Sequence, residues 1–149
     1  EVGEHHQPAT HLIPVVLQAI DGQRPALTIH GTDYDTPDGT CIRDYVHVSD
    51  LVEAHVRGLR WLEEGGESRV FNLGTGHGFS VREVIEAARR TTNRPVPAEE
   101  GPRRAGDCTR LVSGSDRAAR DLGWRPERSA LETMIGDAWR WHRTGGYTP

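Results

Sequence analysis

The pattern of apolar and polar positions in the first third of the chain predicts a helix and two strands. Apolar residues recur at helical spacing over 10–21, and Gly22 stands where the end of a helix favours a left-handed residue. Residues 27–30 have the pattern of a short strand, and alternating apolar residues over 42–48 predict a half-buried one. The polar loop between them, 31–40, is long, and long ordered loops tend to be functional.

The middle of the chain predicts two helices with a strand between them. The first covers 49–64, where a serine is a suitable N-cap and a glycine pair follows the last turn. Residues 69–73 are predicted as a strand, and the glycine-rich loop 74–78 comes directly after it. Ser80 and Glu83 have the spacing of a capping box, which marks the start of the second helix.

The last third predicts a basic loop over 102–107, a short helix over 115–123 and a final helix. A second capping box, Ser129 with Glu132, is expected to open the final helix, which ends before two glycines. The order is helix, strand, strand, helix, strand, helix, helix, helix. This alternation indicates an α/β protein.

Composition narrows the class of protein. The chain has 149 residues, 35% of them hydrophobic, and a net charge of −4, whereas general nucleic-acid binders are usually basic. No apolar run approaches the roughly 18 residues of a membrane span, and two cysteines are too few for a disulfide scaffold or a zinc site. These features predict a cytoplasmic globular protein. Three of its four tryptophans, Trp124, Trp139 and Trp141, are expected to anchor a core.

The glycine-rich loop is the first candidate for chemistry. A strand, glycines and a helix N-terminus in succession can bind phosphate through free N–H groups. The dinucleotide fingerprint G-x-G-x-x-G is not matched, because the glycines are Gly74, Gly76 and Gly78. A structural turn is therefore favoured over a direct phosphate contact.

Charged pairs in two loops are the second candidate. Arg103 and Arg104, with Asp107 nearby, offer guanidinium forks for phosphate and a carboxylate for ribose hydroxyls. Arg43 and Asp44 offer a second phosphate contact. Solvated surface ion pairs explain the same residues, and spacing alone favours that interpretation.

Residues that perform chemistry by themselves are not found. Glu4, His5 and His6 have no third ligand at a recognisable metal-binding spacing, so a solvated tail is favoured and no metal ligand is assigned. The sequence contains neither Tyr-x-x-x-Lys nor a Gly-x-Ser-x-Gly elbow. No catalytic residue is therefore assigned, and the chain has the features of a binding portion.

Several segments together closely resemble one enzyme family. They are GTDYDTPDGTCIRDYVHVSDL at 31–51, FNLGTG at 71–76, SV at 80–81, RRAGD at 103–107 and LGW at 122–124. In these residues the chain resembles the UDP-glucose 4-epimerases, which are extended short-chain dehydrogenases/reductases. The likeness runs in order along essentially all 149 residues. The loop at 33–40 is typical of these epimerases rather than of related dehydratases and decarboxylases.

The resemblance implies a fold and a reaction. Residues 1–149 are expected to be the C-terminal, UDP-sugar-binding portion of such an enzyme, with 43–64 packing on a Rossmann NAD-binding domain outside this chain. The family interconverts UDP-glucose and UDP-galactose through a 4-keto sugar, with NAD bound mainly by the N-terminal half. The full enzyme is expected to be a homodimer. Alternatives are a non-catalytic nucleotide-sugar-binding module or part of a related dehydratase or decarboxylase.

The resemblance also implies a set of substrate-binding residues. Two arginines match family positions on the diphosphate, a carboxylate matches the position on the ribose, and four others match positions beside the diphosphate or the uracil. In that order they are Arg43 and Arg104; Asp107; His11 and Leu12; Thr28 and His30. His11 replaces the usual Asn, and Leu111 stands where some members have Tyr.

Overall fold

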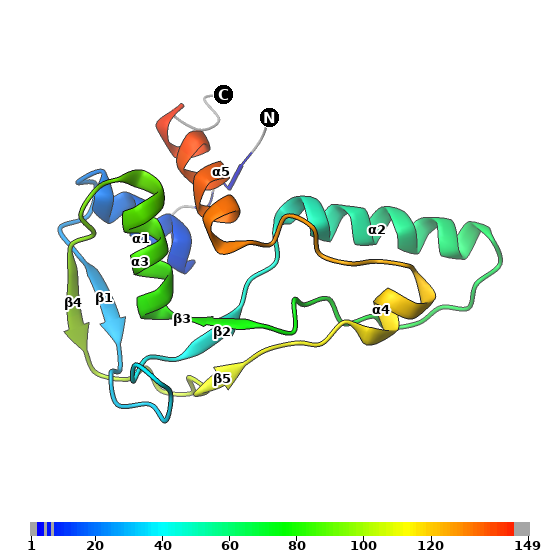
Figure 1. Ribbon diagram of the computed structural model, residues 1–149, viewed down its shortest axis with the longest axis horizontal. Coiled ribbons are helices and arrows are strands. Elements are labelled where there is room, and N and C mark those ends of the chain that lie inside the picture. Colours follow the sequence, from blue (N-terminus) through cyan, green and yellow to red (C-terminus); the bar gives the residue numbers. More distant parts are fainter. Residues whose placement is uncertain (1–2, 5, 7, 145–149) are drawn as a thin grey trace. The chain divides into compact units, whose positions relative to one another are not determined.

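The computed structural model describes residues 3, 4, 6 and 8–144. The chain divides into two compact units, whose elements are labelled in Figure 1. The first unit contains 1–42, 80–109 and 131–149, and the second contains 43–79 and 110–130. The mixed helix and strand content confirms the predicted α/β class.

The first unit packs three helices beside a two-stranded parallel sheet. Its sheet pairs β1 with β4, and the register places Leu27 opposite Ala98 and His30 opposite Gly101. The three helices pack against one another, with Leu17, Val84 and Ile135 fully buried among them. The elements are α1 (Leu12–Ile20), β1 (Leu27–His30), α3 (Val81–Thr92), β4 (Ala98–Gly101) and α5 (Leu131–Arg143).

Local signals in the first unit mark β1, the end of α1 and the start of α3 as predicted. β1 covers the predicted residues, and Gly22 after α1 has the left-handed φ of +74°. The capping box of α3 is confirmed. The Ser80 hydroxyl accepts from the Glu83 N–H at 3.0 Å, and the Glu83 carboxylate accepts from the Ser80 N–H at 2.7 Å.

The second unit is organised around Trp124, which is fully buried. Its indole N–H donates to the backbone carbonyl of Asp50 at 2.7 Å. The core anchor predicted at Trp124 is confirmed, whereas Trp139 and Trp141 on α5 of the first unit are only half-buried. The helices of the unit are α2 (Val48–Glu63) and α4 (Asp116–Asp121), and β3 (Gly78–Ser80), β2 (Ile42–Asp44) and β5 (Arg110–Leu111) form a sheet in the order β3-β2-β5.

Asp50 is a buried carboxylate at the start of α2. It accepts hydrogen bonds from the Ser129 hydroxyl at 2.6 Å and from the backbone N–H of Arg128 at 2.9 Å. Burial by itself raises the pKa of Asp50, but these hydrogen bonds outweigh it and hold the pKa below its usual value. The carboxylate thus fastens the chain at 128–129 to the first turn of α2.

The second unit is therefore expected to lose stability in acid through Asp50. Because the folded pKa is lowered, its contribution is present above the unfolded pKa of about 3.9 and is lost as pH falls through the folded value. Urea unfolding between pH 7 and pH 3 tests this. Asp50→Asn should flatten the acid loss, whereas Glu64→Gln, at an exposed position, should not. Equal acid losses in Asp50→Asn and the unmodified chain would contradict the assignment.

Two predicted helix starts are wrong, because each serine that was expected as the N-cap bonds to a different side chain. α2 begins at Val48, with His47 as its N-cap and the His47 ring nitrogen accepting from the Ser49 N–H at 3.0 Å. The strand predicted over 42–48 therefore ends at Asp44. α5 begins at Leu131, because the Ser129 hydroxyl that was expected to cap it bonds to Asp50.

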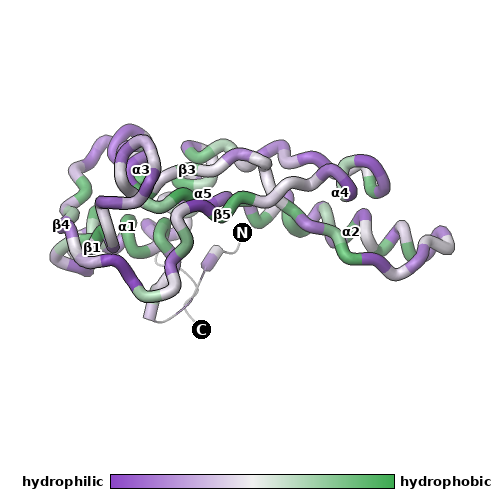
Figure 2. Tube along the Cα trace, turned by 90° about the horizontal axis from the view of Figure 1, so that it is seen from below, coloured by the Kyte–Doolittle hydropathy of each residue, from purple (hydrophilic) through white to green (hydrophobic). Residues whose placement is uncertain are grey.

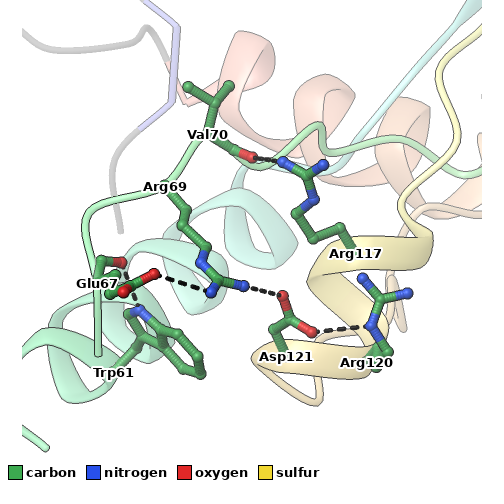
Figure 3. Close-up of polar contacts among 7 residues, drawn as sticks. All are labelled: Trp61, Glu67, Arg69, Val70, Arg117, Arg120 and Asp121. Atoms are coloured by element: carbon green, nitrogen blue, oxygen red, sulfur yellow. Dashed lines mark hydrogen bonds and ion pairs between the residues drawn. The ribbon is translucent and has the colours of Figure 1, made fainter. Parts of the chain in front are cut away.

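The strand predicted over 69–73 is also wrong, because this segment joins no sheet in the described part of the chain. Side chains hold its beginning instead (Figure 3). Arg117 donates to the carbonyl of Val70 at 3.1 Å, and the Trp61 indole donates to the carbonyl of Glu67 at 2.9 Å. The guanidinium of Arg69 lies 5.7 Å from the Trp61 ring. The sequence pattern signalled an extended segment but not the absence of a partner strand.

β4 and β5 were not predicted from the sequence. Three of the four residues of β4 are exposed and two are glutamates, so no apolar alternation marks it. β4 is a strand because it pairs with β1. β5 has only two residues, both exposed. These strands are specified by their neighbours rather than by their own side chains.

The helix α2 carries an uncovered apolar surface. Only Asp50 and Ala54 are buried along its sixteen residues. Figure 2 shows the apolar positions that recur along this helix. Six large apolar side chains on it are between 38% and 62% exposed, and they are Val48, Leu51, Val52, Val56, Leu59 and Leu62. In the part of the chain that the structure describes, none of the helices is both long and apolar enough to cross a bilayer.

Candidate functional site

The basic loop 102–107 follows directly from the end of β4 and is placed by the β1–β4 pairing. His30 lies opposite Gly101, and the N–H of Gly31 donates to the carbonyl of Gly101 at 2.9 Å. Thr28 is exposed on the same strand and lies close to Gly101. A Cβ placed on Gly101 would be 2.7 Å from the methyl group of Thr28. The structure therefore brings Thr28 and His30 beside the start of the basic loop.

Arg104 and Asp107 lie at the two ends of a tight turn. The N–H of Asp107 donates to the carbonyl of Arg104 at 3.3 Å, and Gly106 has the positive φ of +84° that the turn requires. Both side chains are exposed. Among the residues that the structure describes, nothing bonds or pairs with the Arg104 guanidinium, so its donors are available to a ligand.

Arg103 lies in different surroundings from its neighbour. Its Nε donates to Oδ1 of Asp33 at 2.7 Å, and its guanidinium carbon lies 4.2 Å from the centre of the Tyr34 ring. The hydrogen bond from Arg103 is the main reason that the pKa of the Asp33 carboxyl is lowered. From the sequence, the two arginines were predicted to form one phosphate site, and the engagement of Arg103 by Asp33 and Tyr34 was missed. The acidic and aromatic residues at 33–34 were the available signal.

The long polar loop 31–40 is fastened at its far end to the start of α3. Asp38 accepts from the Thr40 N–H at 2.9 Å, from the Thr40 hydroxyl at 2.7 Å and from the Ser80 hydroxyl. Burial by itself raises the pKa of Asp38, yet the hydrogen bonds from Ser80 and Thr40 lower it overall. The loop is thus held at both Tyr34 and Asp38, as an ordered functional loop would need.

His11 and Leu12 lie at the start of α1. His11 is the N-cap residue, and its exposed ring nitrogen lies 2.8 Å from a carboxylate oxygen of Glu4. No hydrogen bond among the described residues joins either side chain to the basic loop. His5 of the candidate metal cluster lies outside the described residues, and no group of three metal-ligating side chains occurs among the others.

Arg43 belongs to the second unit, where it lines an open hollow of about 450 Å³. The neighbouring Asp44 is turned to the glycine-rich loop. Its carboxylate accepts from the Thr75 hydroxyl at 2.6 Å, from the Thr75 N–H at 3.1 Å and from the Ser113 N–H at 3.2 Å. Other lining residues of the hollow are Asn72, Leu73, Leu111 and Val112.

The glycine-rich loop has a structural reason for its glycines. A Cβ at Gly74 would lie 2.1 Å from the carbonyl oxygen of Ser113, and Gly76 has a φ of +71°. The N–H that follows Gly74, on Thr75, already donates to Asp44. These contacts support the favoured interpretation of a structural turn.

Comparison with known proteins shows what the chain is similar to. A family model described as the NAD dependent epimerase/dehydratase family matches residues 2–74. A UDP-glucose 4-epimerase from Halalkalibacterium halodurans is 52% identical over 142 residues, which are 95% of this chain and 42% of that protein. The chain thus spans less than half the length of the relatives that it matches.

Solved structures give the same result. A crystal structure of UDP-glucose 4-epimerase matches 99% of this chain and 46% of its own, with 54% identity and a TM-score of 0.95. The UDP-glucose 4-epimerase from Bifidobacterium longum, crystallised with NAD+ and UDP, is 36% identical. It covers 90% of this chain and 39% of its own, with a TM-score of 0.82. The resemblance noted from the sequence is confirmed.

Proposed function

We propose, from the homology of this chain to the UDP-glucose 4-epimerases, that it forms the C-terminal, UDP-gripping part of such an enzyme. The enzyme would interconvert UDP-glucose and UDP-galactose. The observation that carries the proposal is the exposed guanidinium of Arg104, which is left unbonded while Arg103 beside it is engaged. A planar fork of donors suits the oxygens of a diphosphate.

The arrangement of the turn supports binding of UDP rather than of a phosphate alone. Arg104 and Asp107 are joined through one backbone hydrogen bond, so a cationic fork and a carboxylate stand on the same turn. The fork suits the diphosphate, and the carboxylate is an acceptor for ribose hydroxyls. A firm hold on UDP leaves the hexose free to present either face to the group that accepts its hydride. The diphosphate contact at Arg43, and the roles of His11, Leu12, Thr28 and His30, stay predictions.

The glycine-rich loop 74–78 does not fit an NAD site. The glycine spacing at 74–78 is wrong for a dinucleotide, and the Thr75 N–H is bonded to Asp44. NAD supplies the hydride transfer in the proposed reaction, and the protein supplies orientation and proton transfer. The sequence has no Tyr-x-x-x-Lys pair. The proposal therefore assigns NAD and the catalytic acid and base to a part of the enzyme outside this chain.

The 149-residue polypeptide is expected to show no epimerase turnover, because it lacks a positioned acid and base. The measurement is conversion of UDP-galactose to UDP-glucose by the purified polypeptide with NAD supplied. The protein that carries this chain, assayed in parallel, is the positive control. Turnover by the polypeptide alone would contradict the assignment of the catalytic acid and base to another part of the enzyme. Absence of turnover in the longer protein, together with retained UDP binding, would favour the non-catalytic binding module.

We further propose that the segment 43–64 packs on the NAD-binding domain of the enzyme. The second unit begins at Arg43, and six large apolar side chains of α2 lie exposed. A large apolar side chain gives up about 1.5–3 kcal/mol when it stays wholly in water rather than being buried, and those of α2 are about half exposed. The six together are therefore comparable with the lower part of the range of a domain's whole stability, about 5–15 kcal/mol. Packing of α2 on a partner surface would account for its exposed apolar side chains.

The 149-residue polypeptide is accordingly expected to associate or to bind hydrophobic dye through α2. Size-exclusion chromatography and dye fluorescence measure this. The double variant Val52→Glu, Leu59→Glu should reduce both, whereas Val70→Glu, at an exposed position outside α2, should change neither. A strictly monomeric polypeptide without dye binding, and with one cooperative transition above about 60 °C, would overturn the proposal.

A further inference from the structure

The two adjacent arginines of the basic loop are engaged in different ways. Arg103 contacts the polar loop 31–40 through two neighbouring residues, Asp33 and Tyr34. Arg104 has no bonded partner among the described residues. Two guanidinium groups with the same chemistry and nearly the same position in the chain therefore have different surroundings.

Three contacts fix the Arg103 guanidinium in place. Its Nε donates to Oδ1 of Asp33 at 2.7 Å, its Nη2 donates to the backbone carbonyl of Asp33, and its central carbon lies over the ring of Tyr34. Tyr34 is only 5% exposed, so the ring is a fixed platform. An exposed ion pair by itself contributes little. A backbone hydrogen bond and a cation–π contact added to it define both the position and the rotation of the group.

The backbone at Gly31 is adapted to this contact. A Cβ at Gly31 would lie 2.6 Å from Cγ of Arg103 and 2.6 Å from the Tyr34 ring, and the φ of Gly31 is +83°. A side chain at this position would therefore meet both partners at once. The loop can close on Arg103 because residue 31 is a glycine.

The partners of Arg103 are themselves anchored. The Tyr34 N–H donates to the carbonyl of Gly39 at 2.9 Å, and Asp38 is bonded to the Ser80 hydroxyl at the N-cap of α3. The polar loop therefore connects Arg103 to a helix of the first unit. These contacts hold Arg103 in a fixed position, and the turn of the basic loop begins at the next residue.

We propose that Arg103 is a positioning residue that sets Arg104 toward the nucleotide, and this rests on the proposed binding of UDP. The clamp of Arg103 with Asp33 and Tyr34 holds the loop in its binding form before the ligand arrives. Preorganisation of this kind strengthens binding because less conformational freedom is lost when the ligand binds. Arg103 is not itself a phosphate ligand in this scheme, because its Nε and Nη2 already donate to Asp33.

The test compares UDP with uridine, which lacks the phosphates, by titration calorimetry on the protein that carries this chain. Arg103→Met is expected to weaken UDP binding about 3- to 10-fold and uridine binding less than about twofold. Asp33→Asn should weaken UDP binding in the same direction, by about twofold, because part of the clamp remains. Arg90→Met removes an exposed arginine paired with Glu132 on the same unit and should change neither ligand.

Two results would overturn the proposal. If Arg103 were a direct phosphate ligand, Asp33→Asn would release a competing carboxylate and tighten UDP binding. If its role were only structural, Arg103→Met would weaken uridine and UDP equally.

A double-mutant comparison separates this inference from the proposed function. In an Arg104→Ala background, Arg103→Met should cause no further loss of UDP affinity, because the group that it positions is gone. A full additional loss would contradict the positioning role. If Arg104→Ala weakens UDP binding while Arg103→Met does not, only the positioning role fails. If Arg104→Ala itself has no effect, the proposed UDP grip fails.

Discussion

Arg104→Ala is expected to weaken UDP binding by about 1.5–3 kcal/mol, or about 10- to 150-fold in Kd. The guanidinium is exposed and unbonded among the described residues, so removing it breaks no contact within the unit and leaves the fold unchanged. A diphosphate that accepts two charge-assisted hydrogen bonds from one fork loses both together. Calorimetric titration of UDP into the protein that carries this chain measures the loss.

The conservative change at the same position gives the more specific result. Arg104→Lys should recover only part of the affinity, because an ammonium group keeps the charge but cannot form a planar fork. Arg90→Ala, at an exposed arginine of the same unit, serves as the control for loss of positive charge. Unchanged UDP affinity in Arg104→Ala would show that the basic loop does not bind the diphosphate.

Trp124→Ala is expected to destabilise the second unit by about 3–5 kcal/mol, as large aromatic-to-alanine changes in cores do. The side chain is fully buried against Ala54 and Ala118, and its indole N–H donates to the Asp50 carbonyl. Removing it leaves a cavity and takes the indole donor away from the Asp50 carbonyl. The loss is a large fraction of a typical total stability of about 5–15 kcal/mol.

Trp124→Phe is the matched variant, because it removes the hydrogen bond but fills much of the cavity. We expect it to be clearly less destabilising than Trp124→Ala. Urea unfolding followed by circular dichroism gives both values. A loss below about 1 kcal/mol in Trp124→Ala would mean that the core of the unit does not depend on this ring.

The parts of the fold that were predictable are those in which a residue satisfies its own neighbours. Ser80 and Glu83 exchange hydrogen bonds across one helical turn, and Gly22 takes a left-handed φ, so each is visible as a short pattern. The strand β1 is marked by its own apolar residues at Leu27 and Ile29. Local chemistry of this kind needs no knowledge of the rest of the chain.

The predictions that were wrong concern groups whose partner is remote in sequence. Ser129 has the spacing of an N-cap, but its hydroxyl bonds to Asp50, which lies 79 residues away along the chain. β4 is polar and becomes a strand only because β1 lies beside it. No short pattern records such a partner.

In the candidate site, too, local patterns were predictable and contacts between remote residues were not. The pattern RRAGD identified Arg104 and Asp107, and the structure places both on one exposed turn. The engagement of Arg103 by Asp33 and Tyr34 joins residues about 70 positions apart. It could not be predicted from the loop alone, although it determines which arginine is available to a ligand.

A crystal structure of the protein that carries this chain, with UDP bound, tests the central claim most directly. The account predicts diphosphate oxygens within hydrogen-bonding distance of the Arg104 guanidinium, and a ribose hydroxyl on the Asp107 carboxylate. It also predicts that Arg103 remains on Asp33 and Tyr34, as it is here. UDP bound with its diphosphate away from the 102–107 turn, and with Arg104 still in solvent, would contradict it.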